Sequence, residues 1–154
     1  MQRNTQNLQV KEIELSYRQD RAVYKGLKIS SSKDAFNYFN QSFNQKLLNI
    51  QEQFLVIFLN RSNKPIGVLK LSTGGINSTV ADIRLIMATA LKSLSSAIII
   101  AHNHPSGELK PSQSDIQLTK QIKDACKFFD LQLLDHLILN PEGEYSSFAD
   151  EGLL

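Results

Sequence analysis

The chain has 154 residues, of which 42% are hydrophobic and 21% are charged, values that are ordinary for one globular domain with a hydrophobic core. Its 17 basic and 15 acidic residues include no Lys/Arg block, so the net charge of +2 gives no case for a nucleic-acid surface. The apolar runs FLVIFL and AIIIA are too short to cross a bilayer, and a single cysteine excludes an internal disulfide. We therefore expect a protein of the reducing cytoplasm that does not enter a membrane.

The N-terminal third begins with a polar segment and continues into a predicted helix. Residues 1–30 lack the apolar core of a signal peptide, although EIELSY alternates apolar and polar side chains as an edge strand does. A helix is expected near 33–48, where Ser31 and Asp34 can form a capping box. The apolar side chains of this segment recur on one helical face: Phe36, Phe39, Phe43 and Leu47.

Strands and helices alternate through the rest of the chain. Strands are expected at 52–60, 66–72, 97–102 and 131–139, and a short one in EYSSFA near the C-terminus. Helices are expected near 79–94 and 113–129. Their inward side chains are predicted to be Ile83, Ile86, Met87, Ala90, Leu91 and Leu94 in the first, and Leu118, Ile122, Ala125 and Phe129 in the second, with Cys126 on or beside that stripe. This order predicts an α/β or α+β sandwich, with helices packed on a mixed sheet.

The end of the buried strand at 97–102 carries the most specific pattern, AHNHPSGELKPSQSD at 101–115. Residues two apart share a strand face, so His102 and His104 line up where the strand ends. A turn through Pro105 and Gly107 would return Asp115, in the first turn of the next helix, toward both histidines. Two imidazole nitrogens and one carboxylate oxygen suit Zn²⁺ and leave a fourth position for water, as in a catalytic zinc site.

Each part of this pattern also has an ordinary structural explanation. Ser112 and Asp115 have the spacing of a capping box, and a His-x-His pair alone is more often two polar residues at a strand end. The combination His-x-His, seven residues, Ser, two residues, Asp is far more specific than either part.

This string resembles the JAMM motif of the JAB/MPN metallohydrolase family, whose best-known members are deubiquitinating isopeptidases. The segments AHNHPSG, PSQSD, LLDHLIL and SSFADEGLL are similar to the RadC-like bacterial branch, historically called DNA repair proteins. The resemblance runs from about Val10 to Leu154 and implies a JAB/MPN, cytidine-deaminase-like metalloprotease fold over 31–154 with one zinc ion. Full-length RadC-type proteins also carry a helix-hairpin-helix region, and no segment of this sequence resembles it.

The resemblance also implies roles for residues outside the ligand set. It places a catalytic glutamate at the head of an early strand, where QEQF offers Glu52 as general base, although an acid there can simply be a solvated strand end. Ser112 would stabilise the oxyanion that forms at the attacked carbonyl. Asp135 and His136 point to opposite faces of a strand, so at most one can support a ligand histidine directly, and a structural hydrogen bond for His136 is an equal alternative.

Three functions follow from these patterns. The first is a zinc-dependent metallohydrolase that cleaves peptide or isopeptide bonds with a metal-activated water. The second is a non-catalytic MPN interaction module. The third is a DNA-associated RadC-type repair factor or nuclease, which the lack of a basic run in the sequence does not favour. No segment carries a recognition motif that names the peptide or protein substrate, or an oligomeric state.

Overall fold

Five strands form one mixed sheet in the computed structural model, which describes residues 28–73 and 81–154. They are β1 (Gln53–Leu59), β2 (Pro65–Thr73), β3 (Ala97–Asn103), β4 (Gln132–Leu139) and β5 (Tyr145–Ser147). Their order in the sheet is β2-β1-β3-β4-β5, and only the central β3–β4 pair is parallel. The predicted strands are confirmed, and so is the α+β class.

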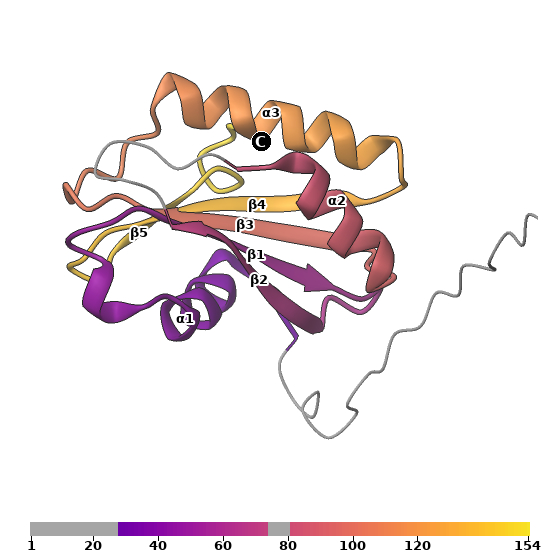
Figure 1. The fold of residues 1–154 in the computed structure, drawn as a ribbon, viewed down its shortest axis with the longest axis horizontal. Coiled ribbons are helices and arrows are strands. Elements are labelled where there is room, and N and C mark those ends of the chain that lie inside the picture. The colour runs from indigo at the N-terminus through magenta and orange to yellow at the C-terminus, as the bar shows by residue number, and fades with distance from the viewer. Residues whose placement is uncertain (1–27, 74–80) are drawn as a thin grey trace, which may run out of the picture.

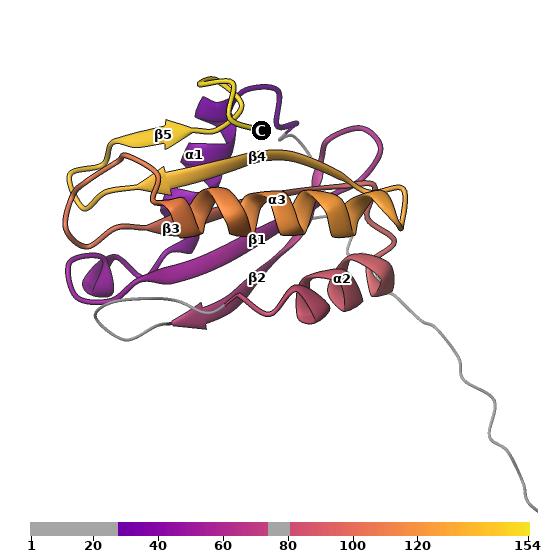
Figure 2. The same cartoon turned by 90° about the horizontal axis from the view of Figure 1, so that it is seen from above.

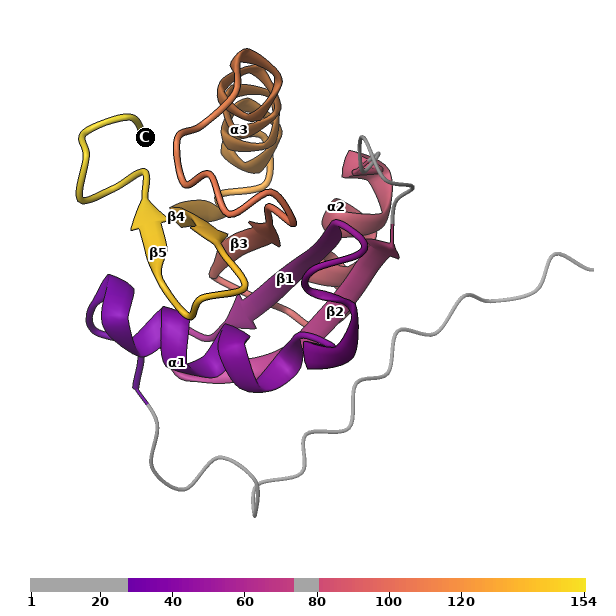
Figure 3. The ribbon, with the colours of Figure 1, turned by 90° about the vertical axis from the view of Figure 1, so that its left-hand side faces the viewer.

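Helices cover both faces of this sheet. They are α1 (Ser32–Ser42), the short 3-10 helix η1 (Gln45–Leu47), α2 (Ile83–Lys92) and α3 (Gln113–Lys127). Figure 1 shows α2 and α3 above the sheet and α1 below it, and the view from above in Figure 2 places α2 beside α3. The end view in Figure 3 shows α1 and α3 on opposite sides of the strands. In the two described ranges, no helix has the length and apolar character needed to span a membrane.

Strands β1 and β3 are buried on both faces, because all seven residues of each strand are buried. Alternate side chains serve different cores. Ile98 and Ile100 of β3 pack in the core under α2 and α3, with Ile122 and Cys126 of α3. The intervening Ile99 and Ala101 pack in the core beside α1. Each face therefore has its own apolar layer. The polar residues at the end of β3 also alternate between the two faces.

The helix predicted near 33–48 is too long, since α1 ends at Ser42 and Phe43 has extended backbone angles of φ −67° and ψ 146°. A side chain from β1 explains this end. The Gln53 amide accepts from the backbone N–H of Asn44 at 3.0 Å and donates to its carbonyl at 3.2 Å, bonds that a continuing helix would have made itself. Phe43 is still buried beside α1, but Leu47 is only partly covered.

Three of the apolar side chains that were predicted to point inward are exposed. Leu91 and Leu94 at the end of α2 are 45% and 75% exposed, and Phe129 after α3 is 46% exposed. Leu94 and Phe129 leave the stripe because the helices end first: α2 stops at Lys92, Leu94 takes a positive φ of 52°, and α3 stops at Lys127. Leu91 lies in the last turn of α2 and is exposed although it is helical. The expected edge strand in EIELSY and the first residues of the helix predicted at 79–94 lie outside the described residues.

Candidate metal centre

The two histidines of the motif lie at the C-terminal end of β3, where the core under α2 and α3 meets the sheet edge. His102 continues the row of Ile98 and Ile100 and is 1% exposed. The backbone N–H of His104 donates to the carbonyl of Leu139 at 2.9 Å, which continues the parallel β3–β4 pairing beyond the end of the strand. Strand pairing thus fixes the backbone on which both imidazoles stand.

The first turn of α3 brings the third member of the cluster into place. Ser112 is the N-cap and forms the predicted capping box: its hydroxyl accepts from the N–H of Asp115, and the Asp115 carboxylate accepts from the N–H of Ser112 at 2.7 Å. The connecting loop turns at Gly107, whose φ of +85° suits a residue without a Cβ. The Asp115 carboxylate is thereby aimed at the end of β3.

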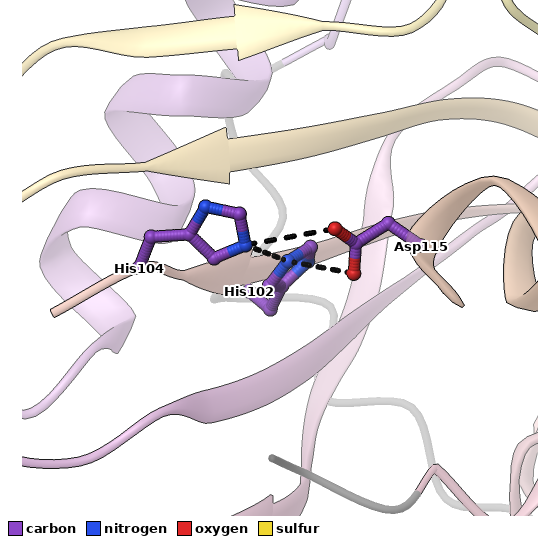
Figure 4. A group of neighbouring side chains, drawn as sticks. All are labelled: His102, His104 and Asp115. Carbon is purple, nitrogen blue, oxygen red and sulfur yellow. Dashed lines mark hydrogen bonds and ion pairs between the residues drawn. The ribbon is translucent and has the colours of Figure 1, made fainter. Parts of the chain in front are cut away.

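His102, His104 and Asp115 converge on one point, as Figure 4 shows. The Nε2 atoms of the two histidines are 2.9 Å apart. Asp115 Oδ1 lies 3.2 Å from His102 Nε2, and Asp115 Oδ2 lies 3.6 Å from His104 Nε2. One ligand atom from each residue lies within 4.8 Å of the others, so this group could hold a metal ion.

The tautomer of His104 determines whether its Nε2 can bind a cation. Its Nδ1 lies 2.6 Å from the carbonyl oxygen of Glu108, which can only accept, so Nδ1 carries the hydrogen and the neutral ring turns its Nε2 lone pair toward His102. Two ring nitrogens 2.9 Å apart are compatible when one carries a hydrogen and donates it to the other, whereas two lone pairs repel and two hydrogens clash. With lone pairs on both, the contact needs a cation between them. A shared cation beside the carboxylate resolves this contact, and two imidazole nitrogens with one carboxylate oxygen fit Zn²⁺.

The electrostatics of the cluster favour positive charge. The hydrogen bond to Asp115 raises the pKa of His104, against the effect of burial. Burial acts to raise the pKa of Asp115, but Nε2–H groups of His102 and His104, where these rings are protonated, and the charge of protonated His102 lower it far below its ordinary value. Asp115 is therefore a carboxylate at any physiological pH, as a metal ligand must be.

Glu52 lies beside this cluster, one residue before β1. Phe54 pairs with His102 across the antiparallel β1–β3 ladder, and its ring stacks on that imidazole at 6.1 Å between centroids. Glu52 is two residues before Phe54, and its charge contributes to the raised pKa of His104 after the larger effects of Asp115, burial and Glu108. Glu52 is half-buried and is not a member of the group that could hold the metal.

Asn103, between the two histidines, was missed in the sequence. It is 0% exposed, and its side chain points to the α1 face. Its Oδ1 accepts from the N–H of Gln53 at 2.7 Å, and its Nδ2 donates to the carbonyls of Leu48 at 2.9 Å and Gln51 at 3.0 Å. Asn103 thus holds the backbone on both sides of Glu52 in place by hydrogen bonds. An asparagine inside an apolar strand was the available signal, because a buried amide must find partners.

Asp135 and His136 separate as their adjacent positions in β4 require. His136 is fully buried and its Nε2 lies 2.8 Å from Nδ1 of His102, while its Nδ1 lies 2.7 Å from Oγ1 of Thr119. Burial lowers the pKa of His136 well below its ordinary value, so the ring is neutral. Asp135 contacts the C-terminal segment on the other face and does not touch the cluster.

Ser112 has its hydroxyl engaged with Asp115. It donates to Asp115 Oδ2 at 2.6 Å and lies 3.0 Å from the hydroxyl of Ser114. The side chain is otherwise exposed, at the rim of the cluster. An oxyanion can receive a hydrogen bond from Ser112 only if the hydroxyl exchanges its present partner for the substrate oxygen.

Comparison with known proteins assigns the family. The sequence profile described as "RadC-like JAB domain" matches residues 29–153. This chain belongs to the RadC-like JAB domain family. The match covers both histidines, Asp115, Glu52 and the whole described sheet, so the resemblance drawn from the motif is confirmed.

Curated relatives of this RadC-like chain carry the name UPF0758 protein. One from Flavobacterium johnsoniae is 47% identical over 131 residues, which are 85% of this chain and 56% of the relative. One from Porphyromonas gingivalis is 53% identical over 104 residues, 68% of this chain and 46% of the relative. One from Aquifex aeolicus is 36% identical over 152 residues, 96% of this chain and 62% of the relative. The chain spans about half the length of the curated relatives it matches.

Proposed function

We propose that this chain is a zinc-dependent hydrolase of peptide or isopeptide bonds, with one zinc ion held by His102, His104 and Asp115. The observation that carries the proposal is the convergence of these three ligand atoms within 4.8 Å. The family adds support, since the JAMM motif is shared with metallohydrolases. When bound, zinc supplies Lewis-acid polarisation and lowers the pKa of a coordinated water toward neutrality.

The residues around the ligands supply the proton chemistry. Glu52 would take the proton of the attacking water and later deliver it to the leaving amine. Its electrostatic effect on His104 and its place outside the ligand group support this role. Ser112, at the rim of the cluster, would donate its hydroxyl hydrogen to the oxyanion at the attacked carbonyl.

The test is a screen of the zinc-loaded full chain against peptide, isopeptide and nucleic-acid substrates, with Glu52→Gln as the first variant. Gln keeps the size of Glu52 and removes its basic oxygen. Zinc affinity should be retained while turnover of an amide substrate falls by ~10²–10⁴-fold. Glu151→Gln is the matched control, because Glu151 is an exposed glutamate of the C-terminal segment and should leave turnover unchanged.

Other outcomes would replace the proposal. Loss of zinc in Glu52→Gln would make Glu52 a ligand or a support for one. Full activity of that variant would assign the base to another acid, with Glu108 and Asp82 next to be replaced. Cleavage of nucleic acid in place of amides would establish the nuclease alternative, and zinc binding without any turnover would favour a non-catalytic module.

A further inference from the structure

A row of three buried side chains runs behind the cluster, from α3 through β4 to β3. The hydroxyl of Thr119 donates to the backbone carbonyl of Asp115 at 2.6 Å and lies 2.7 Å from Nδ1 of His136. Nε2 of His136 lies 2.8 Å from Nδ1 of His102. Thr119, His136 and His102 are 3%, 0% and 1% exposed, so bulk water cannot substitute for any of these partners.

The direction of every bond in this row follows from its first member. A hydroxyl has one hydrogen, and that of Thr119 is given to the Asp115 carbonyl, which can only accept. Toward His136 the hydroxyl must therefore accept, so Nδ1 of His136 carries a hydrogen. The ring is fully buried against the rings of Phe54 and Phe148, where a second hydrogen would bury a positive charge, so this is its one ring hydrogen. Nε2 of His136 then carries a lone pair and accepts from Nδ1–H of His102. The remaining nitrogen of His102, Nε2, is left with its lone pair toward His104 and Asp115.

We propose that Thr119 is a positioning residue that fixes, through His136, the His102 tautomer whose Nε2 can bind the metal. The Thr119 hydroxyl contacts the backbone of Asp115 and the ring of His136, and it lies two hydrogen bonds away from His102. The inference rests on the zinc site of the proposed function, but the tautomers that it assigns to His136 and His102 can be measured without zinc.

Removal of the Thr119 hydroxyl should reverse the direction of the hydrogen bond between His136 and His102. In Thr119→Val the shape is kept, but Nδ1–H of His136 has no acceptor, so the ring gains by moving its hydrogen to Nε2 and donating to His102. His102 would then accept at Nδ1 and carry its hydrogen on Nε2, the atom that zinc needs. Zinc binding must restore the original tautomers and leave a buried N–H unsatisfied. Loss of an outer hydrogen-bond partner of this kind typically weakens metal affinity by about 10- to 100-fold.

The experiment measures both consequences in the full chain. Long-range ¹H–¹⁵N correlation spectra report the tautomer of each imidazole, and His102, His104 and His136 are the three histidines of the sequence. Zinc affinity is measured by competition with a chelator. Wild type should show Nδ1–H on His136 with and without zinc. Thr119→Val should show Nε2–H on zinc-free His136 and an affinity about 10- to 100-fold lower.

Two variants separate this role from a general effect on α3. Thr119→Ser restores the hydroxyl and should recover both the His136 tautomer and the zinc affinity. Thr89→Val removes the same kind of bond, from Thr89 Oγ1 to the carbonyl of Leu85 at 2.8 Å, in α2 and away from the histidines. It should change neither measurement.

The inference fails if wild-type His136 carries its hydrogen on Nε2, a result that needs no variant to fold. It also fails if Thr119→Val keeps the wild-type tautomer and zinc affinity. A wild-type chain that binds no zinc would defeat the proposed function instead, while Nδ1–H on His136 and its shift in Thr119→Val would still support the row.

Discussion

The two faces of the sheet bury polar side chains in different ways. On the α1 face, Asp135 and Asn103 are bonded mainly to backbone groups. Asp135 accepts from the hydroxyl of Ser147 at 2.6 Å, from the N–H of His136 at 2.7 Å and from the N–H of Ala149 at 3.0 Å. On the α2 and α3 face, His102 and His136 are bonded to other side chains.

The difference lies in whether donors and acceptors balance. The carboxylate of Asp135 accepts three hydrogen bonds, and the amide of Asn103 has its oxygen and both hydrogens used. The row from Thr119 through His136 to His102 ends in a lone pair that meets a second ring nitrogen and a carboxylate. Buried polar groups whose donors and acceptors are all paired stabilise a fold, whereas several unpaired lone pairs at one point create affinity for a cation.

Asp115→Asn should have the largest effect, because it removes the charge on which this affinity depends. The Asn oxygen can still accept from the N–H of Ser112, so the helix cap is retained, but an amide NH₂ replaces the other oxygen, which lies 3.2 Å from Nε2 of His102. Zinc affinity should fall by more than the about 10- to 100-fold expected for an outer partner. Chelator competition measures this, with circular dichroism as the check on folding. Retained affinity would remove Asp115 from the ligand set.

Asn103→Asp should be the most damaging change on the α1 face. It replaces an NH₂ group by an oxygen that faces the carbonyls of Leu48 and Gln51 in a buried site. We expect unfolding free energy to fall by about 3 kcal/mol or more, since each buried unsatisfied group costs about 1–3 kcal/mol. Zinc affinity of the folded protein should be retained, while turnover should fall as in Glu52→Gln because the Glu52 segment is released.

Asn60→Asp is the matched control for this change. Asn60 uses its side-chain oxygen, which accepts from the N–H groups of Ser62 at 2.9 Å and Lys64 at 3.1 Å, and an aspartate can accept in the same way. Urea denaturation should show little change. If Asn103→Asp is equally mild, the hydrogen bonds that hold the Glu52 segment are not a source of stability.

Asp135→Ala should lower stability by about 2–3 kcal/mol, because buried donors lose their acceptor. Asp135→Asn should cost less, about 1 kcal/mol, because its oxygen can serve the N–H groups of His136 and Ala149 while its NH₂ faces the Ser147 hydroxyl. Both variants should bind zinc as tightly as wild type does. A zinc affinity that falls in step with stability would show that the two faces are coupled through β4.

Cys126→Ala should have the smallest effect. Cys126 packs in the core under α2 and α3, and burial raises the pKa of its thiol to about 11. The thiol should therefore resist alkylation in the folded chain at pH 8 and react only after unfolding. The alanine variant should lose about 1 kcal/mol of stability and no zinc affinity. Rapid labelling of folded wild type would contradict the burial on which this expectation depends.

The sequence predicted the framework and the three candidate ligands but not the supports behind them. Strand alternation was sufficient to align His102 with His104, and the helix cap at Ser112 was sufficient to place Asp115 in the first turn of α3. Thr119 and Asn103 were missed because their partners are 17 and about 50 residues away in the chain. The end of α1 was missed for the same reason, since Gln53 supplies the bonds that end it.

Local sequence patterns thus determined most of the secondary structure and the candidate ligands. Side-chain periodicity decided the strands and helices, and the spacing of His102, His104, Ser112 and Asp115 decided where a cation would be attracted. Only the tertiary structure decided the direction of the hydrogen bonds that leave Nε2 of His102 unprotonated, because that direction depends on which donor and which acceptor meet across β3, β4 and α3. A lone pair is a property of the tautomer, and the tautomer is set by contacts that the linear sequence does not encode locally.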